Sequence, residues 1–439
     1  MKLDTKKTIQ VGFAFLSICA FWQMYNAIIP LILRFTFNMP ETISGAIMAA
    51  DNVLALFLLP LFGGLSDKCK SKMGKRKPFV LFGTIAAVIL MLLIPLIDNS
   101  YFANPSVGKE ALFIGVLGAL LVAMGTYRSP AVALMPDVTP KPLRSRGNAI
   151  INLMGALGGI IYLVIASVML NSKEQHENYL PIFLIVAGIM VVSVAIVMIT
   201  VDEVALNKKM REYEEAHPEE NLEVEDESGN VDLPKEVKRS LFFLLFSVAF
   251  WFIAYNAMET WFTTFAKTVW DMTTGQASLC LTIATAGAIL SYIPSGGLAG
   301  KIGRKKTILI GIVVMFIAFL IGFVFTYTND SFSVVLYVLF AAVGLGWAFI
   351  NVNSLPMVLE MCKGSDIGKF TGLYYTFSMT AQIVTPIVAG FLLEHVSYKT
   401  LFPYAAVFMV VAFITMCNVL HGDSKLITKK GLEAFDVED

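Results

Sequence analysis

The stretch from residue 249 to residue 261 reads Ala-Phe-Trp-Phe-Ile-Ala-Tyr-Asn-Ala-Met-Glu-Thr-Trp. It places Asn256 and Glu259 inside a segment that is otherwise apolar enough to cross a bilayer. A carboxylate at such a position is costly, so it is a functional candidate. The stretch has a partial copy near the N-terminus, with Ala-Phe-Trp at residues 20–22 and Tyr-Asn-Ala at residues 25–27. The sequence therefore indicates two versions of one unit, each opening with a helix that carries polar groups into the membrane.

The composition excludes an ordinary soluble globule. Hydrophobic residues make up 56% of the 439 residues and charged residues only 15%, which is typical of an integral membrane protein. The short basic segment at residues 1–8 precedes an apolar run long enough to span, so we expect an anchor and no cleaved signal. The five cysteines lack Cys-x-x-Cys spacing, and we expect no disulfide, metal site or cofactor. The four histidines fall in loops or at span ends, which leaves proton chemistry to carboxylates.

The chain contains twelve apolar runs of membrane-spanning length, in two sets of six. They lie near residues 9–33, 43–66, 78–97, 111–135, 148–170, 180–201, 241–265, 277–299, 307–327, 332–359, 370–393 and 400–420. We therefore predict an all-α membrane protein built from two pseudo-symmetric six-helix bundles. Its predicted parts are a first bundle at 1–201, an acidic linker at 202–239, a second bundle at 240–422 and a tail at 423–439.

The distribution of Lys and Arg predicts the orientation. One side of the membrane collects 21 of them in the termini and short loops, and the other side holds five. By the positive-inside rule both termini are cytoplasmic, in a multi-pass protein of the plasma membrane or bacterial inner membrane. The linker carries thirteen acidic and six basic residues, so we expect it to be solvated, cytoplasmic and partly helical.

Polar residues recur with a period of three spans. Spans 3, 6, 9 and 12 are almost purely apolar, as lipid-facing helices should be. Spans 1, 4, 7 and 10 carry the costly groups, which predicts that the first helix of each triplet lines a central cavity. These groups are Gln23, Asn26, Arg128, Asn256, Glu259, Asn351 and Asn353.

Two corresponding loops, at residues 63–78 and 296–306, combine glycines with basic residues. Glycines allow two helix ends to approach closely, and basic side chains can pair with Asp67 and with helix C-termini. The loops resemble the loop signature of the major facilitator superfamily, although a generic basic topogenic loop is the alternative. The candidate cytoplasmic gate comprises Asp67, Gly74, Lys75, Arg76, Gly303, Arg304 and Lys305.

A narrower resemblance lies at the end of span 4 and in span 10. The segment 127–137 reads Tyr-Arg-Ser-Pro-Ala-Val-Ala-Leu-Met-Pro-Asp, and the segment 351–356 reads Asn-Val-Asn-Ser-Leu-Pro. Both resemble the glycoside-pentoside-hexuronide cation symporters, and most closely the sucrose and maltose proton symporters and their bacterial relatives. This resemblance implies import of a small glucoside with a cation. The chain has Ala55 and Leu59 where the sodium-coupled branch carries paired carboxylates, so we expect protons as the coupling ion.

Two carboxylates are candidates for carrying the proton. Asp51 is the first choice, about 12 Å deep in span 2 from the outer surface, and Glu259 is the second. Arg128, which would bind substrate or bias the gate, enters from the same side to about 26 Å, so we expect no direct ion pair with Asp51. The alternatives are structural: Asp51 hydrogen-bonded to a neighbouring helix, and Glu259 near the outer headgroups.

A sugar site needs amide and charged groups beside aromatic rings. Spans 1 and 7 supply this mixture at equivalent positions, and we expect Tyr25 and Asn26 to face Tyr255 and Asn256 across the substrate. Any one of these aromatic residues is also explained by packing. The predicted substrate-binding residues are Trp22, Gln23, Tyr25, Asn26, Arg128, Trp251, Tyr255, Asn256, Asn351, Asn353 and Gln382.

These patterns predict a monomeric importer of a small sugar with protons. A proton-coupled multidrug or metabolite antiporter is the main alternative, and it predicts a more apolar cavity with fewer amides. A sugar-sensing receptor that does not transport is a third. An enzyme has little support because the sequence shows no nucleophile-base pair, metal cluster or phosphate loop. Nucleic-acid binding has no support, since the basic residues serve topology.

Overall fold

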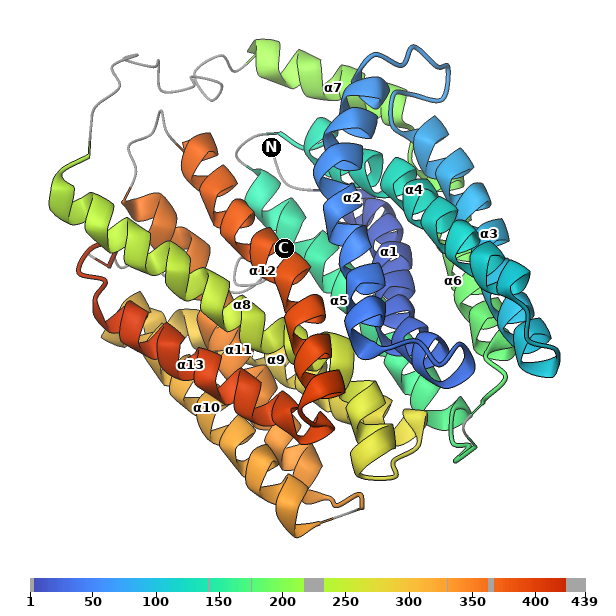
Figure 1. Ribbon diagram of the computed structural model, residues 1–439. Helices are drawn as coiled ribbons and strands as arrows, with labels where there is room; N and C mark the ends of the chain where they lie inside the picture. Colours follow the sequence, from blue (N-terminus) through green and yellow to red (C-terminus); the bar gives the residue numbers. More distant parts are fainter. Residues whose placement is uncertain are drawn as a thin grey trace. The chain divides into compact units, whose positions relative to one another are not determined.

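The computed structural model describes residues 4–140, 143–174, 176–216, 233–329, 331–361 and 367–423. Twelve helices in these ranges are long and apolar enough to cross a membrane, which confirms the predicted all-α architecture (Figure 1). The first six are α1 (Thr5–Leu31), α2 (Glu41–Asp67), α3 (Lys77–Ala103), α4 (Val107–Asp137), α5 (Arg144–Met169) and α6 (Leu180–Thr200). The other six are α8 (Lys235–Val269), α9 (Thr274–Ile302), α10 (Arg304–Thr328), α11 (Val335–Glu360), α12 (Ile367–His395) and α13 (Leu401–Cys417).

Polar side chains cap the start of α1, α4 and α9, and these helices begin before their apolar runs. The side chain of Asp4 accepts a hydrogen bond from the Lys7 backbone N–H at the start of α1. At the start of α9, Thr273 and Gln276 each accept from the other's backbone N–H and form a capping box. Such caps satisfy N–H groups that a helix leaves without partners, so helix ends fall outside the hydrophobic stretch.

The predicted linker is helical at both of its ends. The helix α7 (Glu203–Ala216) follows α6 almost directly, and α8 already begins at Lys235. Residues 217–232 and the tail from 424 onward lie outside the described residues. The linker therefore begins as a structured extension of the first bundle.

The chain divides into two compact units. Residues 1–40 and 50–221 form the first unit, and residues 41–49 and 222–439 form the second. In the first unit, α1 packs along α5 and α6 while α3 packs along α4 and α6. In the second unit, α8 packs along α12 and α13 while α10 packs along α11 and α13, which is the same pairing pattern. The sequence repeat thus corresponds to a repeat in helix packing.

The helix α2 departs from this pattern. Its counterpart α9 packs tightly along α11, where a Cβ added to Gly344 would lie 2.0 Å from the carbonyl oxygen of Ala284. Only 17% of the apolar window of α2 is buried, the smallest share among the twelve spans. The loose packing of α2 leaves room for a pocket beside it.

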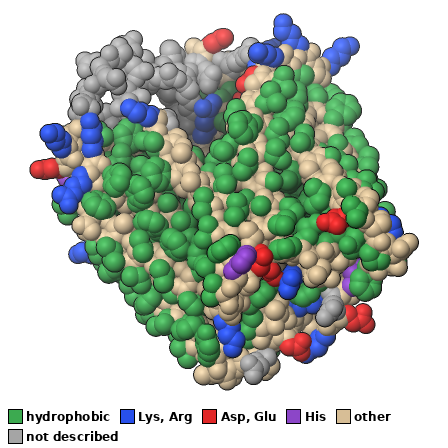
Figure 2. Space-filling model, viewed as in Figure 1, with side chains coloured by type: hydrophobic (Ala, Val, Ile, Leu, Met, Phe, Trp, Pro, Cys, Tyr) green, Lys and Arg blue, Asp and Glu red, His purple; other side chains and the backbone are tan. Residues whose placement is uncertain are grey.

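The exposed surface of the spans is strongly apolar. Phe82 and Ile89 of α3 and Val192 of α6 are 66%, 58% and 60% exposed. Figure 2 shows hydrophobic side chains over most of the visible face, with Lys and Arg gathered mainly at its upper edge. An apolar surface this extensive is suited to contact with lipid chains.

Candidate functional site

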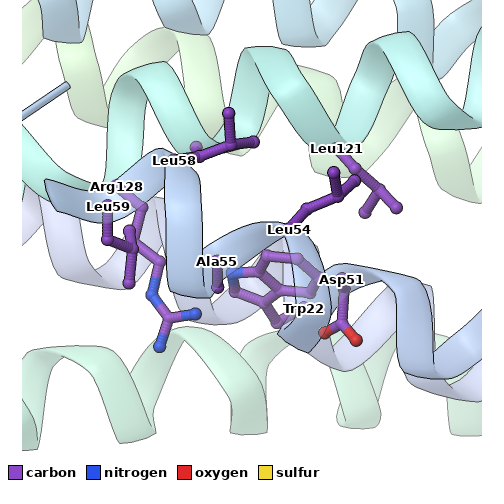
Figure 3. Close-up of a pocket in the computed structure, with 9 residues that line it drawn as sticks. Trp22, Asp51, Leu54, Ala55, Leu58, Leu59, Leu121 and Arg128 are labelled. Carbon is purple, nitrogen blue, oxygen red and sulfur yellow. The ribbon is translucent and has the colours of Figure 1, made fainter. Parts of the chain in front are cut away.

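A pocket lies within the first unit, between α1, α2 and α4. The space between its lining residues amounts to about 260 Å³ when the open solvent at its mouth is included. Its lining combines one carboxylate, one guanidinium and one indole with an apolar wall (Figure 3). The lining residues are Trp22, Asp51, Leu54, Ala55, Leu58, Leu59, Leu121, Gly125 and Arg128. The pocket thus brings together three predicted site residues from three helices.

Asp51 and Arg128 lie toward opposite ends of this pocket. In Figure 3 the indole of Trp22 lies between them, and the Arg128 guanidinium carbon is 5.8 Å from the centroid of the Trp22 ring. Within the described ranges the two charged side chains form no direct ion pair. The Nδ2 of Asn52 donates a hydrogen bond of 2.9 Å to the Asp51 carboxylate. Asp51 therefore has an amide partner, and among the described residues it forms no direct ion pair, although the charge of Arg128 acts on it through space.

The aromatic residues of α1 form a cluster behind the pocket. The Trp22 ring meets Phe21 and Tyr25 edge-on, with centroids 5.2 and 5.4 Å away. Tyr25 is 1% exposed, and its hydroxyl has no hydrogen-bond partner in the described part of the chain. Gln23 and Asn26 are half-buried. Of the four residues predicted on this helix, Trp22 is the one that lines the pocket.

In the second unit, the predicted polar face of α8 meets an aromatic residue of α11. The Tyr255 ring stacks on Trp347 at 3.9 Å, and Phe252 meets the same indole edge-on at 5.3 Å. Asn256 donates to the carbonyl of Phe252 in its own helix at 2.8 Å. Trp251 is fully buried. Trp347 was not among the predicted site residues, although a tryptophan in a span that carries two asparagines is a visible signal.

The two asparagines of α11 have different surroundings. Asn353 donates to Ser295 Oγ at 3.1 Å and to the carbonyl of Phe349 at 2.8 Å, so it joins α11 to α9. Asn351 is 5% exposed, and its Nδ2 has no partner among the described residues. Glu259 and Gln382 are half-buried. The expected facing of Tyr25–Asn26 and Tyr255–Asn256 joins the two units and stays a prediction.

The predicted gate loop of the first unit is held by carboxylates. Arg76 contacts Asp67 and Ser66 and donates to Asp137 at 2.7 Å. Burial lowers the pKa of the Arg76 guanidinium, but Asp137 and Asp67 outweigh it and raise that pKa above its ordinary value. This arginine therefore stays charged and ties the end of α2 to the end of α4.

A second carboxylate anchors the same loop from the start of α7. Glu203 is fully buried and accepts backbone N–H groups of Lys75, Arg76 and Lys77 at 2.6 to 3.1 Å. Lys77 in turn donates through Nζ to the carbonyls of Met198 and Val201 at 2.9 and 2.7 Å. We call Arg76, Lys77, Asp137 and Glu203 the first loop clasp. Gly74 allows this close approach, since it has φ +108° and a Cβ there would lie 2.3 Å from Glu203 Oε2.

The second unit repeats this arrangement. Arg304 pairs with Glu360 at 2.5 Å, and Asp423 accepts the backbone N–H groups of Arg304 and Lys305 at 2.7 and 3.2 Å. Lys305 Nζ donates to the carbonyls of Cys417 and Val419 at 2.9 and 2.6 Å. We call Arg304, Lys305, Glu360 and Asp423 the second loop clasp. The predicted gate included the basic residues of both clasps except Lys77. It did not include the clasp carboxylates, which follow equivalent spans in the two halves: Asp137 and Glu203 in the first, Glu360 and Asp423 in the second.

One histidine lies in a more enclosed place than its loop position suggests. His176 has an 11% exposed side chain, lies 3.3 Å from the fully buried carboxylate of Asp98 and stacks on Phe102 at 4.0 Å. It is therefore part of the first unit's packing at the end of α3. Within the described residues, no group of three or more His, Cys, Asp or Glu side chains could hold a metal ion.

Comparisons with known proteins give sugar transporters as partial matches. Sucrose transport protein SUT3 of Oryza sativa subsp. indica is 27% identical over 195 residues, covering 39% of this chain and 38% of that protein. Proton-associated sugar transporter A of Homo sapiens is 30% identical over 135 residues, covering 30% of this chain and 18% of that protein. The chain thus matches well under half the length of these relatives. An uncharacterised MFS-type transporter of Methanocaldococcus jannaschii is 24% identical over 396 residues and 89% of each chain.

Solved structures share the fold at low sequence identity. A bacterial homologue of the iron transporter ferroportin matches with TM-score 0.69 and 11% identity, covering 95% of this chain and 99% of that one. The nucleoside transporter NupG matches with TM-score 0.64 and 16% identity, again covering 95% and 99%. A family model described as Major Facilitator Superfamily matches residues 11–275 and 267–432. With nearly the whole chain matched, this protein belongs to the Major Facilitator Superfamily of transporters.

Proposed function

We propose that this protein imports a small glucoside of the sucrose or maltose class together with protons, by alternating access. The observation that carries the proposal is the pocket, where a carboxylate, an indole and a guanidinium from three spanning helices line one space. An indole offers a flat apolar face to a sugar ring, and a guanidinium offers donors to its hydroxyl groups. The similarity to sugar transporters over part of the chain supports the same substrate class.

Asp51 is the proposed proton carrier, and Glu259 is the second choice. Keeping a carboxylate charged inside a bilayer is costly, and Asp51 forms no ion pair among the described residues, so that the charge of Arg128 acts on it only from the other end of the pocket. Its helix, α2, is the least buried span, so a change in charge there meets little packing resistance. These features suit a group that gains and loses a proton in each cycle.

The remaining assignments complete the proposal. Arg128 and Trp22 bind the sugar from the first unit, and Tyr255, Asn256 and Asn351 bind it from the second. The two loop clasps form the cytoplasmic gate. The protein acts as a monomer with both termini in the cytoplasm.

The test is sugar uptake into proteoliposomes. One proton crossing 100 mV supplies about 2.3 kcal/mol, enough for about 50-fold accumulation of sugar at one proton per sugar. We expect wild-type protein to accumulate sucrose or maltose and to take up one proton with each sugar molecule, which alkalinises the outer medium. Asp51→Asn should retain exchange of labelled sugar and lose both accumulation and proton influx. If Asp51→Asn keeps full uphill accumulation, Asp51 is not the proton carrier, and Glu259→Gln becomes the decisive variant.

A proton-coupled antiporter for drugs or metabolites is the second candidate. It is favoured by the wall of the pocket, where none of the nine lining residues is an amide and five are Leu or Ala. The same proteoliposomes separate the two candidates. Sugar-stimulated proton uptake supports the symporter, whereas proton release on addition of an apolar cation, with no response to sugars, supports the antiporter.

A further inference from the structure

Arg128 lies where its helix is locally weakened. The proline at position 130 has no backbone N–H, so the carbonyl of Thr126 loses its helical hydrogen-bond donor in the middle of α4. The arginine side chain itself is long and flexible. The guanidinium of Arg128 can therefore hold a single position toward a ligand only if contacts with other helices hold this part of α4 in place.

The residue before Arg128 fixes α4 to α1. Tyr127 is fully buried, and its hydroxyl lies 2.9 Å from the carbonyl oxygen of Ala14 and 2.8 Å from Ser17 Oγ. Both partners belong to α1, the helix that also carries Trp22. The Tyr127 hydroxyl thus sets the position of α4 relative to the indole on which Arg128 rests.

The residue after Arg128 fixes α4 to α2. The Ser129 hydroxyl donates to the carbonyl of Leu59 at 2.8 Å, and Leu59 itself lines the pocket. Gly63, one turn further along α2, lies so close that an added Cβ would be 3.1 Å from Ser129 Oγ. This bond holds the pocket's α2 wall against the helix that carries Arg128.

A third helix supports the same point. A Cβ added to Gly83 of α3 would lie 3.0 Å from the backbone nitrogen of Tyr127, so the two helices touch there. The segment 127–129 is therefore held by α1, α2 and α3, immediately around the one arginine that reaches the pocket.

We infer that Tyr127 and Ser129 are positioning residues for Arg128, which hold its guanidinium against Trp22 at the end of the pocket away from Asp51. Neither side chain lines the pocket, so both act through Arg128. Sugar affinity depends on them to the extent that Arg128 binds sugar, and that part of the inference rests on the proposed function. The placement of Arg128 against Trp22 does not depend on any substrate.

The first readout is independent of sugar. The full-length protein is labelled with 5-fluorotryptophan, and the Trp22 signal in the fluorine spectrum is assigned with Trp22→Phe. We expect Tyr127→Phe and Ser129→Ala to shift this signal, because the guanidinium leaves the ring face. Tyr162→Phe is the matched control, since Tyr162 is also fully buried in the first unit but its hydroxyl has no partner among the described residues.

The second readout is a double-mutant cycle on sugar uptake. Loss of one positioning hydrogen bond should raise the KM about 3- to 10-fold with little change in maximal rate. In an Arg128→Ala background the same substitutions should have no further effect, because their route to the sugar is gone. Ser129→Thr keeps the hydroxyl and should restore the KM. Ser167→Ala is the matched control, because the hydroxyl of this half-buried serine donates to the carbonyl of Val164 in its own helix, α5.

The outcomes are distinguishable. Equal losses with and without Arg128, or an unchanged Trp22 signal in both variants, would show that Tyr127 and Ser129 are merely structural and overturn the inference. A shifted Trp22 signal in a protein that neither binds nor transports sugar would support the positioning and refute the proposed function. If Tyr127→Phe does not fold, Ser129→Ala with its threonine rescue decides the question alone.

Discussion

Removing the Glu203 carboxylate should destabilise the first unit through a single loop. In the structure this side chain is fully buried and accepts three successive backbone N–H groups, from residues 75 to 77, at the start of α3. Without it, those donors lose their partner at a helix N-terminus, where capping alone contributes about 0.5 to 2 kcal/mol. An orphaned buried donor costs about 1 to 3 kcal/mol. Water can reach the exposed side of the loop and satisfy part of these donors, so the expected loss of unfolding free energy for Glu203→Ala is about 3 kcal/mol.

The measurement is thermal stability of the full chain in detergent. For a unit of roughly 200 residues, about 3 kcal/mol corresponds to a fall of about 6 to 12 °C in Tm. Glu203→Gln keeps one acceptor oxygen and should lose about half as much. Asp423→Asn in the second loop clasp should cost less than Glu203→Ala, because Asp423 accepts two backbone N–H groups instead of three.

The control lies on the same helix as Glu203. Glu212 has a 62% exposed side chain and only a 3.8 Å pair with Lys208, so Glu212→Gln should leave Tm unchanged. If Glu203→Ala melts within about 1 °C of wild type, or Glu212→Gln loses as much, then α7 is not anchored through Glu203. Either result would remove the physical basis of the first loop clasp.

Three further substitutions test the packing and the pocket. Gly344→Ala would place a Cβ 2.0 Å from a backbone oxygen of α9 and should cost about 1 to 3 kcal/mol in thermal unfolding, whereas Gly64→Ala, with open space around it, should be neutral. His176→Gln should remove the imidazole beside the buried carboxylate of Asp98 and lower Tm, and adding Asp98→Asn should restore most of the loss; an unchanged Tm would contradict the pairing. Ala55→Phe should fill the pocket and abolish sugar binding in a calorimetric titration while the protein still folds; retained binding would place the sugar site elsewhere.

The sequence alone was sufficient to predict the spanning helices, because the hydropathy of a segment is a local property. Twelve apolar runs gave twelve spanning helices, and the loop motif placed Arg76 beside Asp67. It could not single out Glu203, which is one of thirteen acidic residues in the linker region. What distinguishes this one is that the fold brings the end of α6 to the start of α3, which is a tertiary fact. The burial of His176 against Asp98 has the same origin, since a histidine in a polar loop carries no local sign of its partner.

Comparison of the two units shows where the repeat breaks. Counted back from the loop glycines Gly63 and Gly296, Asp51 of α2 corresponds to Ala284 of α9. Counted back from the clasp carboxylates of α4 and α11, the pocket residue Leu121 corresponds to Gly344. Small residues at these positions let α9 and α11 come into backbone contact, and the space that forms the pocket in the first unit is closed there.

The same count aligns Arg128 with Asn351, so the first unit has a charge where the second has a buried amide whose Nδ2 has no partner in the described part of the chain. The contacts that hold helix ends together are repeated in both loop clasps, whereas the positions around the pocket differ. Both units need contacts that hold their helix ends together. Binding and release of a single proton, in contrast, need a carboxylate in only one of the two units. The asymmetry therefore favours Asp51 over Glu259 as the proposed proton carrier, since Asp51 lines a pocket together with a guanidinium and an indole.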